Sequence, residues 1–277
     1  MPVFDNHFHL DPLGLYLDAA KMFERAGGTH LMLTHLPYDD IPIARGDDYA
    51  TAFNRTLHTA KLVRESTKLT VWVAVGPYPV DLLGLDERLG LAAAVEAMKR
   101  GMDLAARLVG KGDVTAIGEI GRPHFRVASD LWAASNEILQ HGMAVAKDAE
   151  CAVVLHTEDP TPDTFAEFGR MADSVGLPRS RVVKHHAPPL VLPDETLGIV
   201  PSLLAREDHL REGLRKGNAF LMETDYIDDP RRPGAVLGPA TVPRKTAKLR
   251  NLGVMTEADA DRIHRQLPAD TYAIEIE

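Results

Sequence analysis

The sequence predicts an α/β protein, built as a single (β/α)8 barrel of the TIM type over residues 1–277. Three observations favour this fold. Short apolar runs recur along the chain, amphipathic helical patterns lie between most of them, and imidazole and carboxylate residues gather where the runs end. The length is normal for such a barrel, and 45% hydrophobic with 26% charged residues is the balance of a folded globular protein.

The predicted strands are short, rich in β-branched residues and bounded by polar residues, Gly or Pro, as buried parallel strands are. The runs that fit this description are 2–7, 29–35, 69–76, 113–119, 151–156, 181–186, 197–204 and 219–225. Eight parallel strands that alternate with helices are expected to close into a barrel.

Helical patterns are clearest at 50–66, 87–110 and 129–149, and Ser129 is the predicted N-cap of the last. The connection between the sixth and seventh strands departs from the pattern, because APPLVLPDET has too much proline for a crossover helix. A doubly wound open sheet is the alternative fold. The Gly-rich phosphate loop that follows the first strand of such sheets is missing here, so the barrel is the better prediction.

Composition narrows the possible functions. The net charge of −9 argues against a protein that coats nucleic acid through charge alone, although it allows a local basic cleft. No apolar run approaches the roughly 18 residues of a membrane span, and the chain opens without the pattern of a signal peptide. Cys151 is the only cysteine and is expected to be a small buried apolar residue, so a reducing, cytoplasmic location is predicted.

Imidazole and carboxylate side chains mark the ends of five predicted strands. In a barrel these ends meet on one face, so we expect the side chains to converge on one pocket. The set is His7, His9, Glu119, His156, either His185 or His186, and Asp225. Because His7 and His9 are two positions apart, they point to the same side of an extended chain.

Mixed imidazole and carboxylate ligands predict a site for divalent metal ions. Such a set suits Zn²⁺, Mn²⁺, Fe²⁺ or Co²⁺, whereas a pure Mg²⁺ site prefers oxygen throughout. The identity of the ion stays open among these metals. Left without a ligand, a buried cluster of this kind would be costly to desolvate.

Two neighbouring histidines compete for the place on the sixth strand. If His186 points into the barrel, Lys184 does too, and its ammonium group is desolvated beside metal ions. If His185 points inward, its interior neighbour is Val183, which packs well. We predict His185 as the ligand and keep His186 as the alternative.

The motifs FDNHFH, AIGEIG, VVLH, VVKHH and LMETD, in this order, resemble those of the TatD-type metal-dependent hydrolases of the amidohydrolase superfamily. The resemblance runs from Phe4 to about Leu252. It implies a TIM barrel that holds one to three divalent metals, with hydrolysis of phosphodiesters, often at DNA ends, as the best-known activity.

The resemblance also implies which ligands bind which metal ion. One metal is assigned to His7, His9 and Asp225, the second to His156 and His185, and Glu119 is placed as the bridge between the two. The family's histidine in His-Cys-Phe-Ser-Gly aligns with His185, which supports the choice made above.

The loops after the strands depart from the family pattern. GPYP replaces Gly-x-His-Pro after the third strand, and YIDDPRRPG follows the eighth. GEIGRPH replaces GEIGLD after the fourth, which places Arg122 and His124 at the predicted pocket mouth. Together with His35 at the end of the second strand, these two residues are the predicted substrate-binding groups.

The other charged residues and histidines have predicted roles outside the metal site. A basic run after the last ligand either steers phosphate or pairs with Asp228 and Asp229. It consists of Arg231, Arg232, Arg244, Lys245 and Lys248. The remaining histidines in helical patterns, His58, His141, His209 and His264, are predicted to be solvated.

The predicted function is a metal-dependent hydrolase that acts on a phosphodiester, with Asp225 as general base and Glu119 as the bridging catalytic carboxylate. Nucleic acid is expected only as a substrate, no membrane partner is expected, and the oligomeric state stays open. One alternative is a hydrolase of the same fold that cleaves a small amide, lactone or phosphate monoester. The other is a metal-binding scaffold without catalysis.

Overall fold

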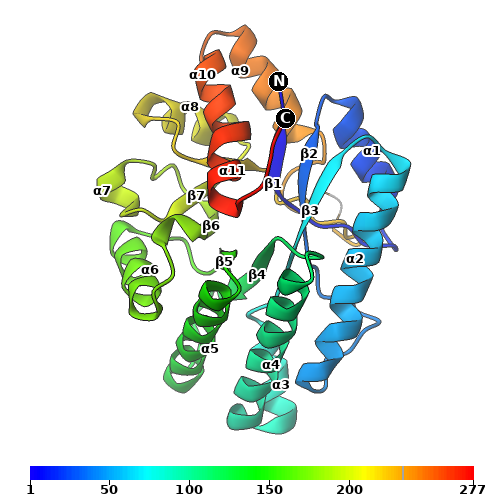
Figure 1. Ribbon diagram of the computed structural model, residues 1–277, viewed down its shortest axis with the longest axis vertical. Coiled ribbons are helices and arrows are strands. Elements are labelled where there is room, and N and C mark those ends of the chain that lie inside the picture. The colour runs from blue at the N-terminus through cyan, green and yellow to red at the C-terminus, as the bar shows by residue number, and fades with distance from the viewer. Residues whose placement is uncertain (233) are drawn as a thin grey trace.

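A computed structural model describes residues 1–232 and 234–277, and in it eight parallel strands follow one another in the order β1 to β8 (Figure 1). Beyond β8, Phe8 forms a bridge with Tyr226, and the His9 amide donates to the Tyr226 carbonyl at 2.9 Å. This contact brings the two edges of the sheet together, so the predicted (β/α)8 barrel is confirmed.

The strands carry the predicted apolar runs. They are β1 (Phe4–Phe8), β2 (His30–Thr34), β3 (Thr70–Val75), β4 (Ala116–Gly121), β5 (Ala152–His156), β6 (Val182–Ala187), β7 (Val200–Leu204) and β8 (Leu221–Glu223). The last strand ends two residues before the predicted boundary, so Asp225 lies in the segment that follows it.

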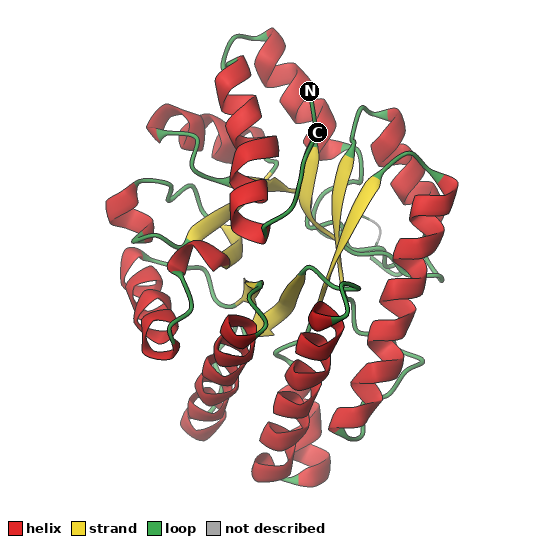
Figure 2. Cartoon of the chain, viewed as in Figure 1, coloured by secondary structure: helices red, strands yellow, loops and turns green. Residues whose placement is uncertain are grey.

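Helices surround the strands (Figure 2). They are α1 (Leu17–Arg25), α2 (Tyr49–Ser66), α3 (Asp81–Leu89), α4 (Leu91–Gly110), α5 (Ser129–Asp148), α6 (Pro162–Val175), α7 (Pro193–Thr196), α8 (Glu207–Lys216), α9 (Thr241–Asn251), α10 (Glu257–Asp261) and α11 (Leu267–Tyr272). No helix of the described ranges is long and apolar enough to cross a membrane.

The structure corrects two sequence predictions about the helices and explains a third. The predicted helix 87–110 is broken at Gly90, whose φ of 80° lies in the left-handed region. Ala128, not Ser129, is the N-cap of α5. The proline-rich connection after β6 forms only the single turn α7, because proline removes amide donors from a helix interior.

The strands pack an apolar cluster at one end of the barrel. It includes Phe4, Met32, Ala74, Val154 and Val183, all buried. Tyr272 at the end of α11 closes this end, and its hydroxyl donates to Asn6 Oδ1 at 2.7 Å. Apolar side chains fill this end of the barrel, and the polar cluster lies at the opposite end.

His264 was predicted to be solvated, and that prediction is wrong. Its side chain is fully buried, with Nδ1 3.2 Å from the backbone of Phe4 and Nε2 2.9 Å from Thr246 Oγ1. The helical turn that carries it packs against β1, which helical periodicity alone does not reveal.

Candidate metal centre

The predicted ligands converge at the carboxyl ends of the strands. His7, His9, Glu119, His185 and Asp225 are each at most 6% exposed, although they come from β1, β4, β6 and the segment after β8. The cluster forms because the parallel register places these strand ends side by side.

Glu119 lies at the centre of one group of ligands. Its Oε1 atom is 2.8 Å from His185 Nε2, 3.1 Å from His156 Nδ1 and 3.2 Å from His7 Nε2. One carboxylate oxygen thus faces three imidazoles from three strands. Glu119 is therefore the shared neighbour of these three imidazoles.

A second group forms around the paired histidines of β1. His7 Nε2 and His9 Nε2 are 3.0 Å apart, and His9 Nε2 is 3.6 Å from Asp225 Oδ1. The ligand atoms of His7, His9 and Asp225 lie within 4.8 Å of one another, as do those of Glu119, His156 and His185. The structure therefore brings together both sets of ligands that the family resemblance implies.

The tautomers of two histidines fit metal binding. His9 Nδ1 is 3.1 Å from the Thr34 carbonyl, which can only accept, so the proton of the neutral ring lies on Nδ1. The lone pair of Nε2 then points into the cluster. His185 Nδ1 likewise faces the Glu223 carboxylate at 3.4 Å. A ring nitrogen held in this way is the usual support of a metal-binding histidine, so the donor set fits a divalent cation.

The charges in the cluster are strongly coupled. Burial raises the pKa of Glu119, but the nearby His185, His156 and His7 outweigh it and hold this pKa well below its ordinary value. Burial lowers the pKa of His185, but Glu119 and Glu223 outweigh it and raise it to about 10. A cation that binds here must therefore displace a proton from His185.

Asp225 also stays ionised. Burial raises its pKa, but the nearby imidazoles, those of His186 and His9 first, outweigh this effect, and the net pKa lies below the ordinary value. Asp225 and His186 both have a positive φ, 47° and 51°, a conformation that is uncommon for residues other than glycine. The backbone on both sides of this pair is held in a strained geometry that aims the two side chains at each other.

The structure places His185, and not His186, against Glu119. His186 has a half-exposed side chain, and its Nδ1 atom lies 3.2 Å from Asp225 Oδ2. Lys184 is buried, and its Nζ donates to the carbonyls of His185 at 2.6 Å and Thr157 at 3.5 Å. The geometry agrees with the predicted choice of His185, and the role of His185 as a ligand stays a prediction.

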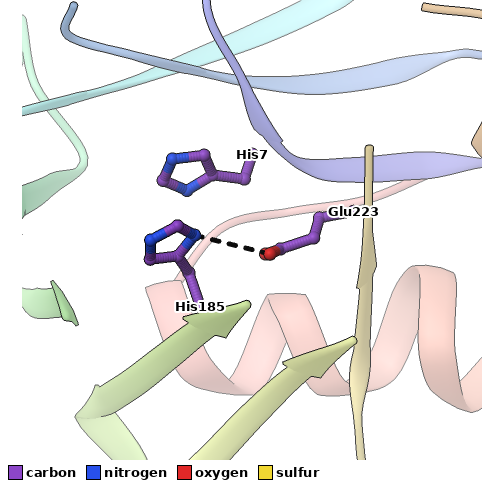
Figure 3. A group of neighbouring side chains, drawn as sticks. All are labelled: His7, His185 and Glu223. Carbon is purple, nitrogen blue, oxygen red and sulfur yellow. Dashed lines mark ion pairs between the residues drawn. The ribbon is translucent and has the colours of Figure 1, made fainter. Parts of the chain in front are cut away.

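Glu223 belongs to the centre and was missed in the sequence. Figure 3 shows its carboxylate directed at His185, whose ring stacks on His7 with centroids 4.2 Å apart. Glu223 also accepts from Ser202 Oγ at 2.5 Å and from the His186 amide at 2.6 Å. The signal in the sequence was an acidic residue inside the buried run LMETD.

Gly121 brings β4 and β5 close together. A Cβ atom at this position would lie 2.1 Å from the His156 carbonyl oxygen, so no side chain fits. The Arg122 amide donates to the same carbonyl at 3.1 Å. This close approach holds Glu119 and His156 beside each other.

Arg122 does not contact the pocket, and its predicted role in substrate binding is corrected. The chain turns outward after Gly121, and the guanidinium lies 4.3 Å from the Trp132 ring. It forms paired hydrogen bonds to Glu158 and to Glu167. Since its side chain is 1% exposed, no substrate oxygen can reach it.

The other two predicted substrate-binding residues are separated by the structure. His124 borders the pocket of the metal centre, and its Nδ1 atom is 2.9 Å from His156 Nε2. His35 is buried, and its Nδ1 atom is hydrogen-bonded to Thr56 Oγ1 at 2.9 Å. It borders a neighbouring cavity and not the pocket of the metal centre. The prediction that His35 reaches the metal pocket is therefore corrected.

The pocket above the centre has a volume of about 570 Å³. Its lining includes Leu36, Pro37, Tyr78, Ile227 and Pro230 as apolar walls, His124, Lys184, His186, Arg231 and Arg232 as basic groups, and Asp11, Asp39, Asp159, Asp228 and Asp229 as acids. Acids thus balance the basic groups at the rim.

The basic run, for which phosphate steering and pairing with acids were the two predicted roles, is largely paired. Arg231 bonds to Asp229 at 3.0 Å and to Asp39 at 2.8 Å, and Arg232 bonds to Asp229 at 2.9 Å. Further along, Lys245 and Lys248 both pair with Glu207 on α8. The part of YIDDPRRPG at residue 233 lies outside the described residues.

A (β/α)8 barrel with imidazoles and carboxylates clustered at its strand ends defines a class, the metal-dependent hydrolases of the amidohydrolase type. Within this class the chain belongs to the TatD-related DNase family, whose family model matches residues 4–273. The resemblance inferred from the motifs is thereby confirmed. The chain is also 38% identical, over 283 residues, to an uncharacterized protein of Methanocaldococcus jannaschii; the match covers 100% of this chain and 98% of that protein.

Solved structures share the fold at low sequence identity. A TatD-like protein from Archaeoglobus fulgidus has a TM-score of 0.63 at 16% identity and covers 98% of this chain and 100% of its own. A TatD homologue from Escherichia coli has a TM-score of 0.66 at 18% identity and covers 98% of each chain. The phosphotriesterase homology protein from Escherichia coli has a TM-score of 0.65 at 13% identity and also covers 98% of each.

Proposed function

We propose that the protein hydrolyses a phosphodiester bond, with DNA as the first substrate to test. The observation that carries the proposal is the shared Glu119 oxygen, which joins two groups of metal ligands at the base of an open pocket. Membership of a DNase family supports this substrate class. The phosphate in the active site of the phosphotriesterase homology protein supports a phosphorus centre as the target.

The residues present fit two divalent ions. His7, His9 and Asp225 would hold one, and His156 and His185 the other, with Glu119 shared between the two groups. Bound ions of this kind acidify a water molecule and offset negative charge on the oxygens of the reacting group. Side chains of the protein carry out the proton transfer and bind the substrate.

Asp225 is the proposed general base. It would take a proton from the attacking water as the new P–O bond forms, while the ester P–O bond breaks and the leaving alkoxide takes up a proton from solvent. Its Oδ2 atom lies 3.2 Å from Nδ1 of His186, which is half-exposed and borders the pocket. His186 therefore provides a route by which the proton leaves for solvent.

One exposed basic group of the pocket, His124, would contact the substrate phosphate, and the buried Lys184 would act on it only through its charge. His124 is exposed at the rim, and Lys184 contributes a positive charge to the pocket wall while its ammonium group stays anchored to backbone carbonyls. The acids Asp39, Asp159 and Asp229 lie on the same rim. They disfavour a long polyanion, so a small phosphate ester, amide or lactone is the second candidate substrate.

A substrate panel separates these candidates. Protein stripped of metal and reloaded with Zn²⁺ or Mn²⁺ is incubated with a DNA oligonucleotide, bis(p-nitrophenyl) phosphate, a phosphate monoester, a lactone and an amide. We expect both phosphodiesters to be cleaved. Glu119→Gln should abolish cleavage, while Asp159→Asn, the matched change on the rim, should not. Cleavage of only the lactone or amide would reject the phosphodiester proposal.

A further inference from the structure

A second cavity of about 250 Å³ lies beside the metal pocket. It is bordered by the loop after β2, by α2 and by the start of α3. Pro37 borders both this cavity and the metal pocket. The two cavities therefore adjoin at this residue.

His35 offers one polar atom to this cavity. Its side chain is buried, and its Nδ1 atom is fixed 2.9 Å from Thr56 Oγ1, which also lies 3.1 Å from the Tyr38 hydroxyl. Burial lowers the pKa of His35 to about 3, so the ring is neutral. Among the described residues, Nε2 of His35 has no hydrogen-bond partner, which leaves it available to a ligand.

Asp81, at the start of α3, offers a second polar atom. Its Oδ2 atom accepts from the Tyr49 hydroxyl at 2.9 Å, whereas its Oδ1 atom has no partner within the described part of the chain. A carboxylate in the wall repels phosphate and attracts an N–H donor. The one cation of the wall, Arg88, already donates to the Ile43 carbonyl at 2.7 Å.

The rest of the wall is apolar. Ile41, Ala52, Val80 and Leu85 border the cavity, together with the faces of Pro37 and Tyr38. Apolar walls with a few placed polar atoms are the usual form of a site for a small organic group. A planar heterocycle that has apolar faces and a hydrogen-bonding edge satisfies both features, and a phosphate or a sugar does not.

We propose that this cavity is a subsite for the nucleobase next to the scissile phosphodiester, with His35 and Asp81 reading the edge of the ring and Gly84 leaving room for it. The inference rests on the proposed function, because it assumes that a nucleotide phosphate lies at the metal centre. It gives the substrate a specific class, a nucleoside-linked phosphodiester.

A variant that fills the cavity tests the subsite without touching the metal ligands. Gly84 borders the cavity, and a Cβ atom there would meet only the end of the flexible Arg88 side chain, at 3.3 Å. Gly84→Leu is therefore expected to fold. Glu87→Leu, which adds the same side chain at an exposed position of α3, is the matched control.

Two esters with one leaving group are compared, thymidine 5′-(p-nitrophenyl phosphate) and methyl p-nitrophenyl phosphate. For the wild type and Glu87→Leu we expect kcat/KM for the nucleoside ester to exceed that for the methyl ester at least 10-fold. In Gly84→Leu this preference should vanish through a higher KM, with the methyl ester unaffected. A preference that is absent in the wild type, or that survives in Gly84→Leu, overturns the subsite.

Binding of free thymidine, followed by ligand-observed NMR, keeps the two proposals separate. If the wild type cleaves neither ester, the proposed function fails. The subsite then still stands if thymidine binds the wild type and Glu87→Leu but not Gly84→Leu. It falls if thymidine does not bind, or binds all three proteins alike.

Discussion

Asp225 is the single residue on which the proposed proton transfer depends. It is both a candidate ligand beside His9 and the partner of His186, and it is held ionised in a buried site. Its Oδ1 atom faces His9 and its Oδ2 atom faces His186, so one oxygen could hold an ion while the other takes the proton.

Asp225→Asn should lower kcat by about 10²- to 10⁴-fold, since general-base catalysis contributes factors of this size. KM should stay within a few-fold, because the pocket residues that bind substrate are unchanged. The variant must be assayed with its metal content measured, and Asp159→Asn serves as the control for loss of one rim charge. Turnover at the wild-type rate in metal-loaded Asp225→Asn would refute the assigned role.

Glu223 acts through His185, so its effect should appear in metal affinity. Glu223→Gln replaces the carboxylate that faces His185 Nδ1 with a neutral amide. We expect the affinity for one Zn²⁺ to fall about 10- to 100-fold, the usual effect of losing a partner behind a ligand. Competition with a chromophoric chelator measures this. Ser202→Ala, which removes a donor to the same carboxylate, should have a smaller effect; equal affinities in wild type and Glu223→Gln would contradict the role.

For single residues, the sequence alone predicts where a side chain points if its position along a strand decides its direction. His7, His9, Glu119 and His156 follow from that rule, and the structure brings them together. Arg122 does not, because Gly121 has a φ of 148° and turns the chain away from the pocket. Backbone conformations of this kind leave no signal beyond the glycine itself.

Arg122 matters instead at the scale of elements. It joins the end of β4 to α5 and α6, through Asn136, Glu158 and Glu167 and through the rings of Trp132 and Phe168. The pKa of this guanidinium is raised above its ordinary value, because bonds to Glu167 and Glu158 outweigh burial. The contacts hold the loop that carries His124 over the pocket.

Arg122→Met should therefore destabilise the fold. Removing one partner of a buried ion pair costs about 3 to 5 kcal/mol, but Glu158 and Glu167 are 29% and 38% exposed. Water screens part of the loss, so we expect about 2 kcal/mol by urea unfolding. Arg126→Met, an exposed change in the same loop, is the control. An unfolding free energy of Arg122→Met equal to that of the wild type would contradict this structural role.

The boundaries of helices and strands were also harder to predict from the sequence than their existence. The strands and long helices follow from hydrophobic periodicity, but the break at Gly90 and the cap at Ala128 depend on local backbone geometry. The short turn α7 was anticipated because proline leaves a clear physical signal.

At the scale of the whole molecule, His264 couples stability to pH. It is buried where the last helices pack against β1, and burial lowers its pKa from 6.5 to about 4. Unfolding exposes the ring, which then binds a proton below pH 6.5. The stabilisation due to neutral His264 is therefore complete above pH 6.5 and is lost as the pH falls towards 4.

His264→Gln should flatten this dependence. Between pH 7 and pH 5 the wild type should lose about 2 kcal/mol more unfolding free energy than the variant, since each pKa unit corresponds to about 1.4 kcal/mol. Urea titrations at both values measure the difference, and His58→Gln, an exposed histidine, should behave as the wild type. An unchanged slope in His264→Gln would show that His264 is not the group responsible.

The central proposal is that two metal ions share the Glu119 carboxylate. Its most direct test is a titration of metal-free protein with Zn²⁺, followed by equilibrium dialysis and elemental analysis. The account predicts two ions per chain in the wild type, one in His156→Ala, which keeps the group of His7, His9 and Asp225, and none held tightly in Glu119→Ala combined with His7→Ala. A wild-type chain that binds no Zn²⁺, or a His156→Ala chain that still binds two, would contradict it.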